Sequence, residues 1–158
     1  MIRGKLLSYG DDLKEVYGIR KEVFVKELGL SKEEEFDFED SSAVHVVVYD
    51  EKLIHQKEQL TPVATGRITY DGEVCEIAHI SVLKEYRNQE YGDFALRMLI
   101  NRAMISGIEE IVLYSPKNIV AFFERVGFIR LIRDEHQNIE PIKMVLNLKN
   151  ISTMCHCK

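Results

Sequence analysis

The fold of this chain is decided by Ile80-Ser81-Val82-Leu83-Lys84-Glu85-Tyr86-Arg87-Asn88-Gln89-Glu90-Tyr91-Gly92, an apolar strand that runs through a short polar turn into an amphipathic helix. After the turn, the apolar positions 96, 99, 100 and 103 share one helical face, which predicts a helix over 91–106. A helix that begins there directs unpaired backbone amides and the positive end of its dipole at the turn. We therefore expect this junction to bind a pyrophosphate or another anion.

The composition is that of one ordinary globular domain. The 158 residues are 46% hydrophobic and 30% charged, so we expect a single domain over 1–150 and a flexible tail over 151–158. No apolar run approaches the roughly 20 residues that span a bilayer, and no signal segment opens the chain, so we expect a cytoplasmic protein with no membrane partner. The net charge of −5 argues against nucleic-acid binding and suits amine-bearing or cationic partners.

The cysteines do not form the framework of a secreted domain. Cys75 lies in a predicted strand, while Cys155 and Cys157 lie in the tail, so reduced thiols are expected. Cys155-His156-Cys157 has ligand-type side chains, but a tetrahedral metal site needs four converging ligands. We therefore predict no metal and interpret the segment as a frayed polar tail.

The rest of the chain alternates between strand and helix patterns. Strands are predicted over 2–7, 45–49, 63–70, 74–82, 111–114, 128–134 and 142–148, and helices over 11–29, 91–106 and 119–123. Residues 50–61 are expected to form a rather long polar hairpin connection, and 31–40 an acidic loop or a short helix followed by a loop. This order predicts an α/β fold, a mixed central sheet of about six to seven strands with helices on both faces.

Motifs in four places, in the right order, resemble the GNAT superfamily of N-acetyltransferases. The turn Arg87-Asn88-Gln89-Glu90-Tyr91-Gly92 resembles its acetyl-CoA loop, an Arg or Gln followed by x-x-Gly-x-Gly. The opening Ile19-Arg20-Lys21-Glu22-Val23-Phe24-Val25-Lys26-Glu27, followed by Asp37, Asp40 and His45, resembles the branch that begins I-R-x-x-V-F-x-x-E. Ala64-Thr65-Gly66-Arg67 is similar to the A-x-G-R strand of that branch, and Phe122-Phe123-Glu124-Arg125-Val126-Gly127-Phe128 resembles the closing F-Y-E-K-x-G-F motif.

The resemblance implies that acetyl-CoA is the cosubstrate and lies where two strands, ending near Val82 and Tyr114, splay apart. The cofactor contacts that it implies are Ile80, Ser81, Val82, Arg87, Asn88, Gln89, Glu90, Tyr91, Gly92, Asp93, Asn118 and Phe123. Asn118 could equally cap a helix. Glu90 replaces the middle glycine of the loop and brings a like charge toward phosphate, although a side chain turned outward would leave the amides usable. Phe123 replaces a tyrosine of the family and has no proton to give.

Amine acetylation needs a base and an acid. Glu76 resembles the position from which histone-type members draw a catalytic glutamate, and burial would raise its pKa; otherwise it is a solvent-facing strand residue. His79 titrates near neutrality but would point to the opposite face from Glu76 unless a bulge intervenes. Tyr114, with Ser115 beside it, is the nearest substitute acid. Cys75 and His79 lie roughly 13 Å apart in a strand, too far for a thiolate–imidazole pair.

We therefore expect an acyl-CoA-dependent N-acyltransferase that moves an acetyl group from acetyl-CoA to a primary amine of a small molecule or peptide by direct attack. The alternative is a catalytically weakened ligand-binding or regulatory module of the same fold, because of Glu90 and Phe123. Residues 33–40 are expected to be mainly a solvated loop, although their charge could attract a cationic amine. Apolar residues in the last strands could support a homodimer.

Overall fold

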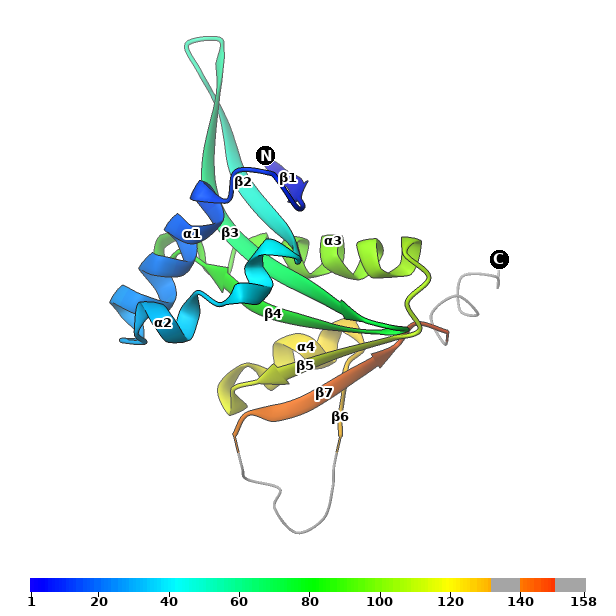
Figure 1. Cartoon of the computed structure of the whole chain (residues 1–158). Coiled ribbons are helices and arrows are strands. Elements are labelled where there is room, and N and C mark those ends of the chain that lie inside the picture. Colours follow the sequence, from blue (N-terminus) through cyan, green and yellow to red (C-terminus); the bar gives the residue numbers. More distant parts are fainter. Residues whose placement is uncertain (132–139, 150–158) are drawn as a thin grey trace. The chain divides into compact units, whose positions relative to one another are not determined.

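The computed structural model describes residues 1–131 and 140–149, and its strands form a seven-stranded sheet in the order β1-β2-β3-β4-β5-β7-β6 (Figure 1). The predicted mixed sheet of six to seven strands is confirmed. Two compact units are distinguished, Met1–Thr69 with His79–Asn101, and Tyr70–Ala78 with Arg102–Lys158. The single domain over 1–150 stays a prediction. No helix in the described ranges is long and apolar enough to cross a membrane.

Three antiparallel strands lie in the sheet of the first unit, together with the last residues of β4 (Val74–Val82). They are β1 (Ile2–Leu7), β2 (Val44–Ile54) and β3 (Lys57–Asp71). The turn between β2 and β3 is made by His55 and Gln56, both left-handed with φ of 49° and 64°. The predicted hairpin connection over 50–61 does join the two strands, but it is not a long loop, because residues 50–54 and 57–61 pair as a two-stranded arm that extends from the unit (Figure 1). Main-chain hydrogen bonds hold such an arm without the apolar alternation that marks a half-buried strand.

Helical segments complete the first unit. They are α1 (Lys14–Arg20), the π-helix η1 (Lys21–Glu27), α2 (Lys32–Glu35), the 3₁₀-helices η2 (Phe38–Ser41) and η3 (Lys84–Tyr86), and α3 (Tyr91–Ile105). The predicted helix over 11–29 is thus a short α-helix that widens into a π-helix. A capping box between Ser31 and Glu34 starts α2, as the Ser-x-x-Glu spacing favours.

Helices lie on both faces of this sheet. Val16 and Ile19 of α1 pack with Val47 of β2 in one hydrophobic cluster. Gly66 pairs with Val46, so it faces the other side, where a Cβ on Gly66 would come within 2.9 Å of Leu99 in α3. The glycine thus lets α3, and with it the turn before the helix, approach β3 closely.

The second unit surrounds the strand β5. The elements are β5 (Glu110–Ser115), β6 (Ile129–Arg130), β7 (Ile142–Asn147), η4 (Lys117–Ile119), α4 (Val120–Val126) and the first residues of β4 (Val74–Val82). β4 and β5 are paired in parallel from Val74 and Glu110 to Glu76 and Val112, and β7 lies antiparallel to both β5 and β6. The strand predicted over 128–134 is shorter in the described part, and its end lies outside the described residues.

Candidate functional site

The turn between β4 and α3 has a glycine-like backbone although its middle glycine is replaced. Asn88 and Glu90 have φ of 60° and 71°, a left-handed conformation that favours glycine. Glu90 is exposed, and its carbonyl accepts a 2.9 Å hydrogen bond from the Phe94 amide at the start of α3. Within residues 1–131 and 140–149, the amides of Asn88, Gln89 and Glu90 donate to no backbone acceptor. The turn therefore presents main-chain donors beside the positive end of α3.

Arg87 anchors the start of this turn. Its guanidinium donates to both carboxylate oxygens of Glu27, with distances of 2.7 Å (Nη1 to Oε1) and 2.6 Å (Nη2 to Oε2). Its Nε donates to the carbonyl of Val82 at 3.0 Å. The hydrogen bond from Arg87 lowers the pKa of Glu27. This pair ties the turn to the last residue of η1 and to the end of β4.

Other side chains hold the remainder of the turn. Tyr91 is buried, packs edge to face against Tyr86 with ring centroids 5.8 Å apart, and donates its hydroxyl hydrogen bond to Asp50. Burial raises the pKa of Tyr91, and the Asp50 carboxylate raises it further. The side-chain amide of Gln89 donates to the Glu85 carbonyl at 3.0 Å, and the Asp93 carboxylate accepts from Arg97 of the same helix at 2.7 Å.

Arg20, at the end of α1, is the centre of a buried charge network. The side chain has 1% of its surface exposed. Nε donates to Oε1 of Glu35 at 2.6 Å, Nη1 donates to Oδ1 of Asp40 at 2.7 Å, and Nη2 donates to the Glu35 carbonyl. The guanidinium also lies over the rings of Tyr17 and Phe36, 5.9 and 5.1 Å from their centroids. A buried charge needs such partners, because leaving it unpaired costs on the order of several kcal/mol.

Arg67 of β3 extends the network. Its Nη1 donates to Oδ1 of Asp40 at 2.9 Å and to Oδ1 of Asp37 at 2.7 Å. Burial works to raise the pKa of Asp37, but the hydrogen bond and the charge of Arg67 outweigh burial and hold that pKa below its ordinary value. Glu35 and Asp40 are buried, so the expectation that the acidic segment is mainly solvated is wrong for these two residues. Their partners lie elsewhere in the sequence, which is why a local charge run did not reveal them.

His79 joins the network from β4. Its Nδ1 lies 2.9 Å from Oε1 of Glu35, the oxygen that Arg20 also contacts. Because a carboxylate accepts, Nδ1 carries the hydrogen, and Nε2 of the neutral ring keeps its lone pair. The side chain is 16% exposed, and its ring packs edge to face against Phe24 at 5.8 Å. A φ of 54° at His79 breaks the regular alternation of the strand, the irregularity on which its candidacy as a base depended.

His45 is the buried histidine of the network and has a different environment. Its Nε2 lies 2.9 Å from the Asp40 carbonyl, which can only accept, so Nε2 carries the hydrogen. Its Nδ1 is buried without a hydrogen-bond partner among the described residues. Burial lowers the pKa of His45, so the ring is neutral near neutral pH.

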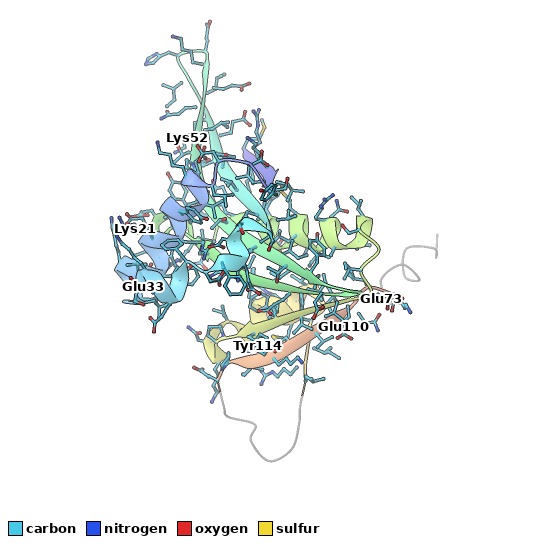
Figure 2. All side chains as sticks on the ribbon, viewed as in Figure 1. Lys21, Glu33, Lys52, Glu73, Glu110 and Tyr114 are labelled. Carbon is cyan, nitrogen blue, oxygen red and sulfur yellow. The ribbon has the colours of Figure 1, made fainter. Side chains whose placement is uncertain are left out.

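Four of the predicted site residues belong to the second unit, namely Glu76, Tyr114, Asn118 and Phe123, and the others belong to the first. Glu76 is exposed, so the burial on which its choice as base depended is absent. Tyr114, which Figure 2 labels on β5, has 49% of its surface exposed, and Asn118 of η4 is exposed as well. Phe123 is buried between Phe122 and Phe128, with ring centroids 5.0 and 6.0 Å away, as a core residue.

Cysteine and metal chemistry find no support in the part of the chain that the structure describes. Burial raises the pKa of the Cys75 thiol to about 12, which leaves it protonated and unreactive. No group of three or more His, Cys, Asp or Glu side chains within 1–131 and 140–149 could hold a metal ion. Cys155, His156 and Cys157 lie outside the described residues.

Comparisons with known proteins agree on one family. The model of the acetyltransferase (GNAT) family matches residues 13–128. YjcF of Bacillus subtilis (strain 168), named an uncharacterized N-acetyltransferase, is 30% identical over 118 residues, which are 75% of this chain and 79% of that protein. A crystal structure from Lactobacillus plantarum, provisionally named an N-acetyltransferase, is 21% identical with a TM-score of 0.77 and covers 93% of this chain and 98% of its own.

A further similar structure was solved with a bound ligand. The PaiA N-acetyltransferase of Thermoplasma acidophilum, solved in complex with coenzyme A, is 15% identical with a TM-score of 0.64, covering 93% of this chain and 99% of its own. At such identities the structures show the fold, while the family is shown by the family model and by YjcF. This chain belongs to the GNAT family of acetyltransferases.

Proposed function

We propose that the protein transfers an acetyl group from acetyl-CoA to a primary amine of a small molecule or peptide by direct attack. The observation that carries the proposal is the backbone of the turn, where Glu90 has the φ of 71° that glycine would adopt. Replacement of the glycine has therefore left the shape of the turn in place. Its main-chain donors still meet the positive end of α3, a combination that suits phosphate.

The residues of the first unit fit the coenzyme. The amides of Asn88, Gln89 and Glu90, together with the first turn of α3 at Tyr91 and Gly92, would hold the phosphates. The strand Ile80-Ser81-Val82 would pair its main chain with the pantetheine amides, as the family resemblance implies. Acetyl-CoA, when bound, supplies an activated thioester. The side chain of Glu90 is exposed, which supports a phosphate site that the carboxylate does not occupy.

His79 is proposed as the general base. An amine is protonated near neutral pH and attacks only after losing a proton. Glu35 accepts from Nδ1 of His79, so Nε2 is the atom that takes the proton from the acceptor. Arg20 holds the same carboxylate oxygen and thereby fixes the direction of the ring. The exposed Glu76 is the weaker choice, while Tyr114 remains the proposed acid for the departing thiolate, with solvent as the substitute.

The first test is calorimetric titration of acetyl-CoA, coenzyme A and dephospho-coenzyme A into the protein at moderate salt. Micromolar binding that weakens without the ribose phosphate is the expected result. Absence of heat from all three ligands would contradict the proposal at its first step, before any acceptor is known.

The second test compares His79→Gln with His55→Gln over a panel of primary amines, with release of free thiol as the readout. His55 lies in the β2–β3 turn, so its variant controls for loss of a histidine. We expect His79→Gln to lower kcat by about 100-fold or more, the usual contribution of a general base, with the affinity for acetyl-CoA unchanged. Full activity of His79→Gln, with loss in Glu76→Gln, would move the base to Glu76.

The alternative function is a ligand-binding or regulatory module with weakened catalysis. Its supporting observation is Phe123, a buried aromatic that has no hydroxyl where the family motif has a tyrosine. Coenzyme binding without turnover on any amine in the wild type, with turnover gained in Phe123→Tyr, would favour this alternative.

A further inference from the structure

The guanidinium of Arg87 is engaged by groups of the protein itself. Both carboxylate oxygens of Glu27 and the carbonyl of Val82 accept from its three nitrogens. The two side chains are about one third exposed, at 36% and 32%, and 60 residues separate them in sequence. This bidentate geometry is specific to an arginine fork and a carboxylate. Three of the five N–H donors of the guanidinium are thus engaged, and a phosphate could take this bidentate face only by displacing Glu27.

The turn that follows Arg87 has an unfavourable backbone. Asn88 and Glu90 both adopt positive φ values, and each residue with a Cβ loses stability in that region. Such a conformation persists only where its surroundings impose it. The surroundings here are the Glu27–Arg87 pair before the strained residues and the Tyr91–Asp50 hydrogen bond after them. The pair therefore acts as a brace on a turn that would otherwise relax.

We propose that Glu27 is a positioning residue: through Arg87 it holds the turn in the conformation that binds phosphate by main-chain amides. The inference rests on the proposed coenzyme binding and adds to it a role for a residue that does not touch the ligand. It also states that the Arg87 side chain acts through the protein and not as a phosphate ligand. A preorganised site binds more tightly, because the free protein already populates the competent conformation.

The opposite role for Glu27 is competition, in which its carboxylate occupies a guanidinium that phosphate would otherwise use. The two roles predict opposite signs. If Glu27 braces the turn, Glu27→Gln weakens binding of coenzyme A; if Glu27 competes, the same change frees Arg87 and strengthens binding.

The experiment is a double-mutant cycle of Glu27→Gln and Arg87→Gln, with the dissociation constant of coenzyme A measured by calorimetry. We expect each single variant to bind about three- to tenfold more weakly and the double variant to bind no more weakly than the weaker single one, since both changes remove the same pair. Glu22→Gln is the matched control, because Glu22 lies on the same π-helix and its ion-pair partner among the described residues is Lys26 of that helix. The affinity of Glu22→Gln for coenzyme A should stay within about twofold of the wild type, because an exposed ion pair contributes little. Tighter binding by Glu27→Gln, or additive losses in the double variant, would overturn the inference.

Amide hydrogen exchange gives a readout that needs no coenzyme. In the free protein, the Phe94 amide, which donates to the Glu90 carbonyl of the turn, should exchange about fivefold faster or more in Glu27→Gln, while Glu22→Gln exchanges like the wild type. Unchanged exchange in Glu27→Gln would refute the brace. Failure of the wild type to bind coenzyme A would instead refute the proposed function, and the exchange rates would still decide whether Glu27 holds the turn.

Discussion

Replacing Glu90 by glycine should stabilise this protein, although most substitutions of an ordered residue destabilise. The reason is the φ of 71°, which glycine adopts freely and a residue with a Cβ does not. The left-handed region costs such a residue roughly 1–2 kcal/mol. About 0.4–1 kcal/mol of this stabilisation is lost again, because the unfolded chain is more flexible with glycine at position 90. The net gain should be about 0.5–1 kcal/mol, or a rise in Tm of about 1–4 °C for a chain of this size.

The measurement is urea unfolding of three variants at position 90. Glu90→Ala removes the carboxylate but keeps the Cβ, so the difference in free energy of unfolding between Glu90→Gly and Glu90→Ala isolates the backbone. Glu90→Gln keeps the side-chain length and isolates the charge. Glu85→Gly, in the 3₁₀-helix η3 of the same connection, is the control in which glycine should destabilise by about 0.5–1 kcal/mol.

The same variants test the coenzyme site. If the phosphates meet main-chain amides near Glu90, Glu90→Gln should tighten binding of coenzyme A through lost repulsion, and Glu90→Gly should tighten it at least as much. Should Glu90→Gly prove no more stable than Glu90→Ala, the left-handed backbone at this position would be refuted. The claim that the turn keeps its glycine shape would fall with it.

Three other predictions follow from buried groups. Arg20→Met should lose about 3–5 kcal/mol of unfolding free energy in urea titration, because it takes the guanidinium away from the buried carboxylates of Glu35 and Asp40. A loss below about 1 kcal/mol would contradict the buried network. His45 has a lowered pKa, so its contribution to stability is present above the unfolded pKa of about 6.5 and is lost as the pH falls below that value. His45→Gln should therefore reduce the slope of unfolding free energy against pH in that range by at most about 1.4 kcal/mol per pH unit. An unchanged slope would contradict this prediction. Cys75, with a pKa of about 12, should resist a thiol reagent until the protein unfolds. Peptide mapping that finds the label on Cys75 in the native protein would contradict this prediction.

The order of elements could be predicted because each has a local signal. Apolar alternation marked β3 and β4, Asp71-Gly72 marked the hairpin between them, and helical periodicity marked α3. The arm formed by the ends of β2 and β3 has no such signal, since its polar residues are exposed and its strands are held by the backbone. The periodicity of apolar residues reflects burial of side chains, so it does not indicate a strand whose side chains are all exposed.

The site could be predicted only where chemistry lies within one turn of chain. The turn after β4 carried its own motif, including the departure at Glu90. Burial of Glu35 and Asp40 depends on Arg20 and Arg67, which no local pattern connects to them. An arginine that follows Val16 by one helical turn was the available clue, because it falls on the apolar face of α1. The orientation of His79 depends on one positive φ, which residue types in a strand do not reveal.

The π-helix η1 connects the two halves of the proposed site. Arg20, which immediately precedes it, holds Glu35 and through that carboxylate His79. Glu27, its last residue, holds Arg87 at the start of the turn that is proposed to bind phosphate. In an α-helix, residues seven apart lie on nearly the same face, whereas the wider π-helical turn changes that relation. This short segment therefore sets the directions of Arg20 and Glu27, the side chains that hold His79, the proposed base, and the turn, which gives a physical reason for a rare helical form at this place.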